Sequence, residues 1–412
     1  MIFWLLNPWD ALPGEIGFER GEQVAAALAA AGHEVTWWQT GYAHAEKKTR
    51  SSQVAIRFLG PRLKLVLLPA EPYASNVSWQ RMRSIADYVC GFAAESRHHR
   101  PPDAVLVSGP IFFIEPVLLY LRHMQGIPLV YEFRDLWPES IISNATGFRR
   151  LARWLAFGGF VLLRRLVFRS CDAIIGLNRT YLEIAQREAG LRPELLTAVA
   201  YPFPAARMPA TASRFTKPPG QIWVIMSGTL GASHDHATLL AAAGALKSLR
   251  PEIRFLITGL GPQAAAIQAE IAANDLNNVA LLGALPAAEF QALLFKCDLG
   301  LALYRRVSPV VFPTKLVDYM MAGIGIITSV QGEGATILTE GDAGSAVAPE
   351  DLAALVAALD SCTSSAGRIA ALKANSARLA LYFSHEHQIK VIVSTLQSVG
   401  ERHASRYDQA GA

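Results

Sequence analysis

A helix start that carries a lysine and, one turn later, an aspartate is the segment of this sequence best suited to bind a phosphate group. Residues 312–323 read FPTKLVDYMMAG. Thr314 is expected to cap this helix, whose first amides then point outward beside Lys315 and favour an anion. Asp318 shares a helix face with Lys315 and can accept hydrogen bonds from ribose hydroxyls. Gly323 is expected to end the helix. A capped surface helix with a Lys–Asp pair would show the same spacing, so the pattern alone leaves both interpretations open.

Two glycine-containing turns follow predicted strands in the same half of the chain. Residues 227–231 read SGTLG and precede His234, and residues 258–262 read TGLGP. Glycines there allow a ligand to approach the backbone, although an ordinary turn would look the same. The second turn lacks the third glycine of a dinucleotide fingerprint, which disfavours a nicotinamide enzyme. Gly332-Glu333 would add a carboxylate near the same edge.

Ionisable side chains gather at the end of a buried strand in the first half of the chain. Residues 131–139 read YEFRDLWPE, in which Arg134 and Asp135 can stabilise or transfer charge. An Arg–Asp pair that only holds a loop is the alternative. Residues 44–50, HAEKKTR, form a charged run that by itself predicts a solvated loop.

Short apolar runs that alternate with helical patterns must position these residues. In the first half the predicted strands are Ile2–Leu6, Glu34–Trp38, Ala104–Val107, Leu129–Glu132, Ala173–Leu177 and Thr197–Ala200. In the second half they are Ile222–Met226, Arg254–Thr258, Val279–Leu282, Leu299–Leu303, Ile324–Thr328 and Gly344–Val347. This alternation predicts parallel sheets built from βαβ units, which bind ligands beyond the carboxyl ends of their strands.

The pattern divides the chain into an N-terminal and a C-terminal domain. Five prolines lie between Tyr201 and Gly220, where no periodicity is visible. The predicted fold class is therefore α/β, with two doubly wound domains at residues 1–205 and 206–380. Residues 381–412 would form a C-terminal helix that packs back on the N-terminal domain, followed by a tail.

The C-terminal helix is expected at about residues 385–399. Gly400 would end it, and the polar residues 401–412 would follow as an irregular tail.

Composition excludes several classes of protein. Of the 412 residues, 51% are hydrophobic and 17% charged, as in globular proteins. The net charge of +4 is too small to indicate a nucleic-acid partner. The four cysteines form no CxxC pair, which predicts neither a disulfide scaffold nor a metal site and favours a reducing, cytoplasmic compartment. The apolar start MIFWLL lacks a basic region and a cleavage site, so we interpret it as a first buried strand.

One segment is strongly basic. Arg149–Arg169 contains six arginines and no acidic residue, and Trp154–Leu163 in its centre is apolar. A helix of this kind can lie in a membrane interface with its arginines on anionic headgroups. A core helix with arginines extending to water from both ends is the alternative.

Taken together, these segments resemble the family-4 retaining glycosyltransferases of the GT-B fold, and within them a bacterial branch that builds surface polysaccharides. The motifs that carry the resemblance are Gly32–Thr36 (GHEVT), Trp37-Trp38, the loop with His44, Lys47 and Arg50, the set Tyr73, Asn76, Ser78 and Arg81, Arg134–Pro138 (RDLWP), the set Pro313, Lys315, Asp318 and Tyr319, and Gly332-Glu333. Their order across most of the chain is more specific than any one of them.

The resemblance implies two Rossmann-like domains that face each other across a cleft, with the acceptor on the N-terminal domain and a nucleotide sugar on the C-terminal one. Lys315 would hold the diphosphate, Asp318 the ribose, and the backbone near Gly283 the base. The implied donor residues are Gly228, Thr229, His234, Gly259, Gly283, Pro313, Thr314, Lys315, Leu316, Asp318 and Glu333. The implied acceptor-side residues are Glu15, His44, Lys47, Arg50, Tyr73 and Arg81, and the implied catalytic residues are Arg134, Asp135 and Lys315.

The activity that the resemblance implies is transfer of a hexosyl or N-acetylhexosaminyl group, with retention, from a UDP-linked or other nucleoside-diphosphate sugar. The acceptor would be a lipid-linked or growing surface polysaccharide. No metal ion or other cofactor would be needed, because protein cations and amides stabilise the leaving diphosphate. The protein would act in the cytoplasm, on the inner face of the membrane, through Arg149–Arg169.

The sequence also departs from the family pattern. Val310 stands where many members have the first glutamate of a pair, and Thr229 and His234 stand where many have Arg and Lys. Residues 14–17, GEIG, replace a common Gly-Gly loop, so Glu15 either positions the acceptor or lies in solvent. These departures leave open a catalytically silent nucleotide-sugar-binding module, and a GT-B sugar epimerase, against which Val310 counts.

Overall fold

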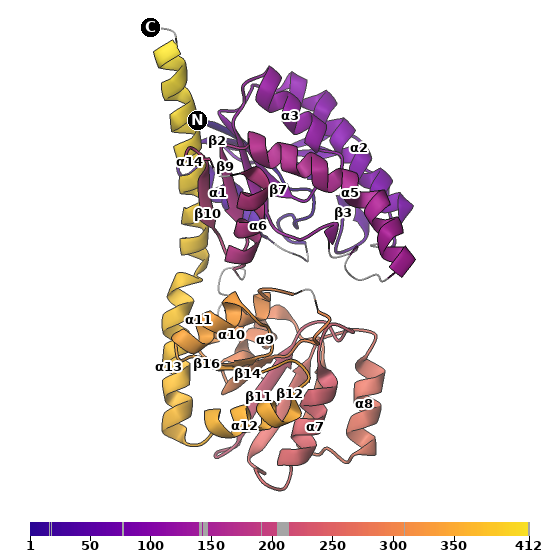
Figure 1. Cartoon of the computed structure of the whole chain (residues 1–412), viewed down its shortest axis with the longest axis vertical. Coiled ribbons are helices and arrows are strands. Elements are labelled where there is room, and N and C mark those ends of the chain that lie inside the picture. The colour runs from indigo at the N-terminus through magenta and orange to yellow at the C-terminus, as the bar shows by residue number, and fades with distance from the viewer. Residues whose placement is uncertain are drawn as a thin grey trace. The chain divides into compact units, whose positions relative to one another are not determined.

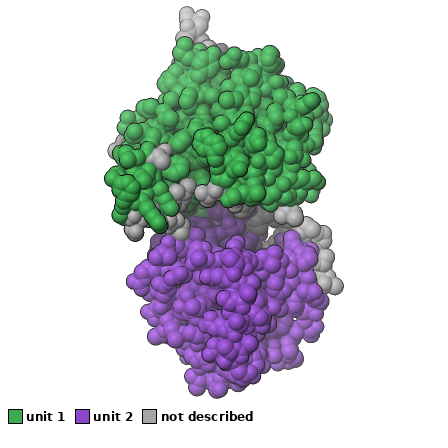
Figure 2. All heavy atoms as spheres, turned by 90° about the vertical axis from the view of Figure 1, so that its right-hand side faces the viewer, with its two compact units in different colours: residues 1–201, 388–412 green, residues 202–387 purple. Residues whose placement is uncertain are grey.

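The computed structural model of the chain forms two compact units (Figure 2). Unit 1 comprises Met1–Tyr201 together with Gln388–Ala412, and unit 2 comprises Pro202–His387. The structure describes all residues except 16, 18, 76–77, 140–141, 143–146, 191, 204–213, 309 and 411–412, and the side chains of residues 156 and 406–410 are also not described. The predicted boundary between residues 205 and 206 lies outside the described residues, as do Ile16 and Asn76 of the sequence motifs.

An eight-stranded sheet forms the centre of unit 1 (Figure 1). Its strands are β1 (Ile2–Leu6), β2 (Glu34–Thr40), β5 (Ala55–Gly60), β6 (Leu63–Leu68), β7 (Ala104–Gly109), β8 (Leu129–Phe133), β9 (Ala173–Gly176) and β10 (Leu196–Val199), and β3 (Tyr42–Ala43) and β4 (Lys48–Thr49) form a separate hairpin. The order is β10-β9-β8-β7-β1-β2-β6-β5, parallel throughout except for the antiparallel edge strand β5. The chain order reverses at β1, and doubly wound sheets bind ligands at such a switch point.

Helices flank this sheet on both faces (Figure 1). They are α1 (Arg20–Ala30), α2 (Trp79–Glu95), the 3-10 helix η1 (Ser96–His98), α3 (Glu115–Met124), α5 (Gly147–Ser170), α6 (Arg179–Ala189) and most of α14 (His385–Ala410). Two helices begin where the sequence supplies a capping side chain: Ser78 accepts a hydrogen bond from the amide of Arg81, and Asn178 caps α6. Trp37 and Trp38 of β2 are fully buried in the core.

Unit 2 contains a six-stranded, fully parallel sheet (Figure 1). The strands are β11 (Ile222–Ser227), β12 (Ile253–Thr258), β13 (Val279–Gly283), β14 (Leu299–Ala302), β15 (Gly325–Thr328) and β16 (Gly344–Ala346). The helices are α7 (His236–Leu246), α8 (Ala264–Ala273), α9 (Ala287–Leu294), α10 (Thr314–Ala322), α11 (Glu333–Glu340), α12 (Leu352–Cys362) and α13 (Ala366–Tyr382). The order β13-β12-β11-β14-β15-β16 is that of a Rossmann fold, with its switch point between β11 and β14. The predicted fold class, two Rossmann-like α/β domains, is confirmed.

The sheet of unit 1 is wider than the sequence pattern predicted. β5 and β6 were both missed, although Leu63, Lys64 and Leu65 alternate as a half-buried strand should. β5 lies at the sheet edge with Ile56 and Phe58 exposed. β5 is therefore a strand because it pairs with β6, not because one of its faces is buried. Without a buried face, its sequence has no alternating hydrophobic pattern from which a strand could be predicted.

The last helix is also longer than predicted. α14 continues to Ala410, and the expected stop at Gly400 is wrong. A Cβ atom at Gly400 would lie 2.7 Å from the sulfur of Met1, so glycine serves close packing there and not helix termination. Ile392 and Leu396 of the same helix are fully buried within unit 1.

The two glycine turns of unit 2 pack backbone against backbone. Gly259 has a φ of +138°, and a Cβ atom there would lie 1.8 Å from the carbonyl oxygen of Gly228. A Cβ atom at Gly261 would lie 2.3 Å from the carbonyl oxygen of Leu230. Glycine is required at both positions, because any side chain would push the turn after β11 away from the turn after β12.

The substitution Gly259→Ala tests this packing. We expect it to lower the free energy of unfolding of unit 2 by roughly 2 kcal/mol or more, because it adds both a clash and an unfavourable backbone conformation. Gly231→Ala is the matched control, since a Cβ atom at Gly231 meets only the Thr229 methyl group, at 3.5 Å. Urea unfolding should separate the two variants, and equal midpoints would contradict the proposed packing.

Candidate active site

The structure brings the predicted phosphate-binding residues of unit 2 together beyond the carboxyl ends of β11 and β14. Gly228 follows β11, and a Cβ atom there would lie 3.5 Å from Nζ of Lys315. The same nitrogen lies 4.9 Å from the centre of the Tyr304 ring, which follows β14. The ring of His234 lies 4.7 Å from that of Tyr304. Lys315 therefore lies at the switch point of the sheet, where doubly wound sheets bind ligands.

Lys315 carries a buried ammonium group. The side chain is only 7% exposed, and its Nζ makes no hydrogen bond to any residue that the structure describes. Burial lowers the pKa of Lys315 to about 7, although the nearby charge of Asp318 acts in the opposite direction. A buried cation without a hydrogen-bond partner destabilises the folded state. Binding of an anion beside Lys315 would therefore be favourable.

Asp318 does not neutralise this lysine. No described ion pair joins the two residues, so the Lys–Asp pair of the alternative interpretation is not formed. Burial raises the pKa of Asp318 to about 6, against the effect of the Lys315 charge. The expectation that Thr314 caps α10 is wrong: Pro313 occupies the capping position, and no side chain of the described residues caps the helix start. The predicted end at Gly323 is confirmed, with a left-handed φ of 64°.

Tyr319 fixes α10 onto the sheet. Its ring is fully buried, and its hydroxyl accepts a hydrogen bond from the amide of Ser227 at 3.0 Å and donates to the carbonyl of Leu301 at 3.3 Å. A Cβ atom at Gly300 would lie 2.4 Å from this ring, so glycine makes room for it. The tyrosine therefore ties the helix that carries Lys315 to the ends of β11 and β14.

His234 lies beside the lysine as a neutral ring. Burial, followed by the charges of Lys315 and His236, lowers the pKa of His234 to about 3. At neutral pH it can therefore donate one hydrogen bond without adding charge. Thr229 is exposed in the turn between β11 and α7.

Two other predicted donor residues, Gly283 and Leu316, have contacts that the sequence did not show. The carbonyl of Gly283 accepts hydrogen bonds from the hydroxyl of Thr258 at 2.7 Å and from the amide of Gly259 at 2.9 Å. Leu316 is fully buried, and a Cβ atom at Gly334 would lie 2.8 Å from it. Leu316 therefore serves packing. Glu333 is the half-buried first residue of α11.

In unit 1, Arg134 is held by an aspartate that sequence analysis missed. Nη1 of Arg134 lies 3.0 Å from Oδ1 of Asp10, which is 1% exposed. Asp10 also accepts hydrogen bonds from Asn7 at 2.6 Å and from the amide of Gly21, at the start of α1, at 2.8 Å. Burial alone would lower the pKa of Arg134, but Asp10 and Glu132 outweigh it and the pKa is raised.

A second buried pair lies beside the first. Nε of Arg20 lies 2.6 Å from Glu132, whose other oxygen accepts a hydrogen bond from Ser108 at 2.7 Å. Burial would raise the pKa of Glu132, but Arg20 and Arg134 outweigh it and the pKa is lowered. These residues come from the ends of β7 and β8 and from α1, far apart in sequence, so only the folded topology reveals the network.

Asp135 lies next to Arg134 but is exposed. Partial desolvation raises its pKa, against the effect of the Arg81 guanidinium. Arg134 and Asp135 belong to unit 1, whereas the third predicted catalytic residue, Lys315, belongs to unit 2.

Two predicted acceptor-side residues, Glu15 and Arg50, form an ion pair. The guanidinium of Arg50 also donates to Gln39 at 2.9 Å and to the carbonyls of Thr40 and Asp10, each at 3.1 Å. Glu15 therefore does not lie free in solvent; it helps to fasten the loop after β1 to the end of β2.

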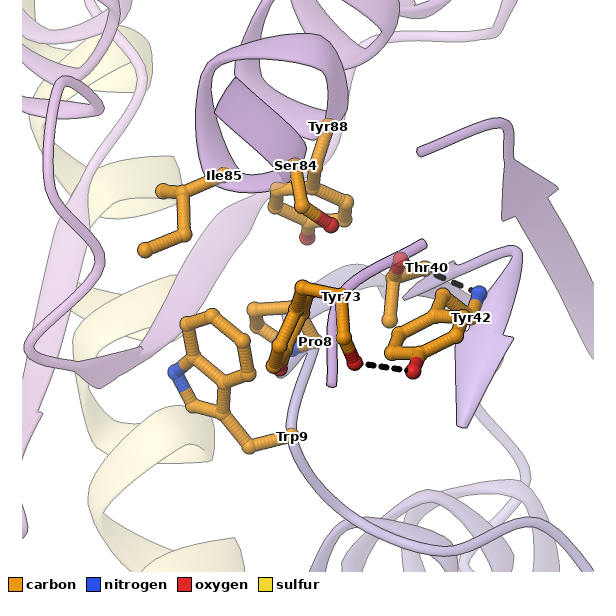
Figure 3. Close-up of a pocket in the computed structure, with 8 residues that line it drawn as sticks. All are labelled: Pro8, Trp9, Thr40, Tyr42, Tyr73, Ser84, Ile85 and Tyr88. Atoms are coloured by element: carbon orange, nitrogen blue, oxygen red, sulfur yellow. Dashed lines mark hydrogen bonds between the residues drawn. The ribbon is translucent and has the colours of Figure 1, made fainter. Parts of the chain in front are cut away.

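The remaining acceptor-side residues gather around aromatic rings at the ends of β1 and β2. Nδ1 of His44 contacts the hydroxyl of Tyr73, and Nζ of Lys47 lies 4.4 Å from the centre of the Tyr73 ring. The guanidinium of Arg81 lies 5.2 Å from the ring of Trp9. Figure 3 shows Trp9 and Tyr73 in a small pocket below the hydroxyl-bearing side chains of α2.

The basic segment forms α5, as the sequence predicted, but one arginine faces inward. Arg164 is 2% exposed and lies 2.7 Å from Glu188, and it also pairs with Glu139. Arg164 is therefore buried in ion pairs and does not extend to solvent or headgroups as both interpretations of this segment implied. The exposed large apolar side chains among the described residues of α5 are Phe148, Leu151, Trp154, Leu155, Leu162 and Leu166. No helix among the described residues is both long and apolar enough to cross a bilayer.

Two family models match the two halves of the chain. Residues 20–202 match a glycosyl transferase 4-like domain, and residues 209–378 match glycosyl transferases group 1. Together the two matches cover most of the sequence. No curated protein sequence matches the chain.

Solved structures with the same fold are distant in sequence. HepE from Anabaena, crystallised with UDP, is 16% identical with a TM-score of 0.63, over 96% of this chain and 99% of that one. WaaG, a glycosyltransferase involved in lipopolysaccharide biosynthesis, is 15% identical with a TM-score of 0.63 over the same shares. A trehalose-6-phosphate protein from E. coli, bound to UDP-2-fluoro glucose, is 13% identical with a TM-score of 0.67, again over 96% and 99%. These likenesses show the fold.

The substitution Lys315→Met tests the buried ammonium. The pKa of Lys315 falls from 10.5 to about 7 on folding. Burial of Lys315 therefore lowers the free energy of unfolding by its full amount below pH 7, and by nothing above about pH 10.5. We expect the variant to gain on the order of 4 kcal/mol of unfolding free energy at pH 6, and only about 1 kcal/mol at pH 9.5. Urea titrations measure both values.

The exposed Lys390→Met serves as the control, with an expected change below about 0.5 kcal/mol. A loss of stability in Lys315→Met at pH 6 would show that the lysine has a partner after all.

Proposed function

We propose that this chain, which belongs to the two-domain glycosyltransferases of the GT-B fold, transfers a hexosyl or N-acetylhexosaminyl group from a UDP-sugar to a lipid-linked or growing surface polysaccharide, with retention. The observation that carries the proposal is the buried ammonium of Lys315, which has no partner among the described residues, beside the uncapped start of α10. The UDP bound by HepE and the role of WaaG in lipopolysaccharide biosynthesis support the choice of donor and product.

In this proposal the donor diphosphate binds at Lys315. Its negative charges would raise the pKa of the lysine, and the free amides at the start of α10 would add hydrogen bonds along the helix axis. Neutral His234 would donate a further hydrogen bond to the phosphates. Asp318, one helical turn on, would accept hydrogen bonds from the ribose hydroxyls.

The chemical step needs a stabilised leaving group. As the bond between the anomeric carbon and the phosphate oxygen breaks, its electron pair passes to the diphosphate, where Lys315 stabilises the developing charge. The acceptor oxygen forms its bond on the same face of the sugar and gives its proton to the leaving phosphate oxygen, which retains the configuration. We include no metal ion in this mechanism, because Lys315 and the α10 amides supply the required positive charge.

We assign the acceptor to the switch point of unit 1. Arg134 keeps its charge because Asp10 binds it, and Asp10 is itself fixed by the amide of Gly21. An arginine fixed in this way can stabilise developing negative charge without rearrangement. Asp135 beside it would orient a hydroxyl of the sugar that is transferred.

The membrane contact that we propose is the exposed face of α5. Apolar side chains such as Trp154 and Leu155, 58% and 69% exposed, alternate with the exposed arginines Arg149, Arg150 and Arg165. A helix with this composition lies in the interface of an anionic bilayer and would bring unit 1 to a lipid-linked acceptor on the cytoplasmic leaflet.

Calorimetry with UDP tests the donor site. We expect Lys315→Met to weaken UDP binding by about 10- to 100-fold, since it removes a hydrogen bond from a charged donor. Because the pKa of free Lys315 is about 7, UDP binding at pH 8 should take up close to one proton in the wild type. Titration in two buffers that differ in ionisation enthalpy measures this uptake.

Proton uptake that persists in Lys315→Met would place the titrating group elsewhere. UDP binding with no transfer to any acceptor would instead favour the silent nucleotide-sugar-binding module. The anomeric configuration of the product, read by NMR, tests retention directly.

Flotation with vesicles that contain phosphatidylglycerol tests the membrane contact. We expect binding at low salt, and a loss of roughly 30-fold in the double variant Arg149→Gln/Arg150→Gln, at about 1 kcal/mol per arginine near an anionic surface. The matched control is Arg306→Gln/Arg378→Gln, two exposed arginines of unit 2. Equal flotation of the two double variants would exclude α5 as the contact.

A further inference from the structure

One arginine of α5 reaches from this helix to the chain that directly follows β8. We call residues 134–139 the β8 segment. Arg164 is 2% exposed, and its Nη1 donates hydrogen bonds to the carbonyl of Trp137 and to Oε2 of Glu139, each at 3.1 Å. Arg164 therefore binds the second half of the segment that begins with two of the proposed catalytic residues.

The same guanidinium also binds α6. Nε and Nη2 of Arg164 donate to the two carboxylate oxygens of Glu188 at 3.1 and 2.7 Å, and Nη2 donates to the second oxygen of Glu139 as well. These contacts and the two of Nη1 match the five N–H groups that a guanidinium offers. Burial would lower the pKa of Arg164, but Glu139 and Glu188 outweigh it and the pKa is raised. Arg164 is therefore charged, and its donors are fully used.

The β8 segment is held at both of its ends. At the start, the amide of Arg134 donates to the carbonyl of Gly109 at 3.1 Å, and the side chain of Arg134 pairs with Asp10. At the other end, Arg164 binds one carbonyl and one carboxylate. Asp135 is exposed between these two fixed ends. Its position therefore depends on the sheet and Asp10 on one side, and on α5 on the other.

Stability alone does not call for an arginine at this place. A buried network of charges often contributes no more to folding than apolar residues of similar volume would. α5 already has such residues, since Val167 and Phe168 are fully buried. An arginine instead supplies direction, because its planar guanidinium binds carboxylates only in a fixed geometry. Cζ of Arg164 also lies 5.0 Å from the centre of the ring of Phe133, the last residue of β8.

We propose that Arg164 is a positioning residue, which holds the β8 segment so that Arg134 and Asp135 keep the arrangement in which they act on acceptor and sugar. The inference rests on the proposed function, which gives those two residues their roles. Arg164 acts through Trp137 and Glu139 and not on the substrate itself. A misplacement of about 1 Å can slow a reaction by roughly 100-fold. Donor binding belongs to unit 2 and should not depend on this link.

Fluorine NMR measures the position of the β8 segment without an activity assay. Incorporation of 5-fluorotryptophan labels the eight tryptophans, and Trp137→Phe identifies the resonance of Trp137. We expect Glu139→Gln to shift or broaden this resonance by more than its linewidth, because an NH2 group then faces the guanidinium of Arg164. The other resonances should stay in place, which shows that the variant is folded.

Glu188→Gln is the matched control. It makes the same change at the same guanidinium, but on the side of α6. Arg164 keeps its bonds to Glu139 and to the carbonyl of Trp137, so the resonance of Trp137 should not move.

Release of UDP from UDP-glucose and from UDP-N-acetylglucosamine, with water as the acceptor, tests the consequence for the reaction. We expect Glu139→Gln and Arg164→Lys to lower kcat about 10-fold or more at unchanged KM, and Glu188→Gln to keep both within about 2-fold. A lysine keeps the charge of Arg164, but it cannot bind two carboxylates and a carbonyl in the same geometry.

Two results would each overturn the proposal: an unchanged Trp137 resonance in Glu139→Gln, and a wild-type kcat in Arg164→Lys. So would equal losses of kcat in Glu139→Gln and Glu188→Gln, which an ion pair with a purely structural role would produce. A wild-type protein that releases no UDP from either sugar nucleotide would instead contradict the proposed function. The fluorine spectra would still show in that case whether Arg164 holds the segment.

Discussion

The side chain of Lys315 is buried, and its Nζ has no hydrogen-bond acceptor among the described residues. Burying an unpaired charge destabilises the folded state, so other interactions in unit 2 must keep the lysine in its buried position. Tyr319 does so from the same helix, through its hydrogen bonds to Ser227 and Leu301. The glycines of the turns after β11 and β12 do so by allowing the two backbones to touch. In the proposed donor complex, an anionic ligand at Lys315 would offset this cost.

Unit 1 handles its charges differently. Arg20, Arg134 and Arg164 each have a carboxylate within 3.0 Å: the first two pairs lie near the carboxyl ends of strands, and the third joins α5 to α6. Pairing fixes the position and protonation of each group. Under the proposed function, the paired arginines of unit 1 would orient the acceptor and the lysine of unit 2 would bind the charged donor.

Most of the fold, and part of the candidate site, could be predicted from short stretches of the sequence. Apolar runs predicted twelve strands that the structure contains, because strands buried in parallel sheets leave a clear hydrophobic pattern. The sequence also predicted that Lys315 and Asp318 lie close together, because one turn of α10 holds both. Asp10 was missed because its partner Arg134, which follows β8, lies 124 residues away in the sequence, and nothing near Asp10 signals the pair. The predicted helix end at Gly400 was wrong for a related reason. A glycine can end a helix or make room for a neighbouring side chain, and only the fold shows that Met1 packs against Gly400.

The division of the chain between the units has a consequence for synthesis. Unit 1 needs residues 388–412, whose side chains Ile392, Leu396 and Val399 complete its core and whose Gln388 accepts a hydrogen bond from the amide of Tyr201. Unit 2 needs only residues 202–387. On the ribosome the later unit can therefore close first, while the earlier one waits with an open face until α14 emerges. Domains usually fold in the order in which they are made. Here unit 1 begins before unit 2 in the chain and is completed after it, so its last helix becomes available only once the end of the chain has been made.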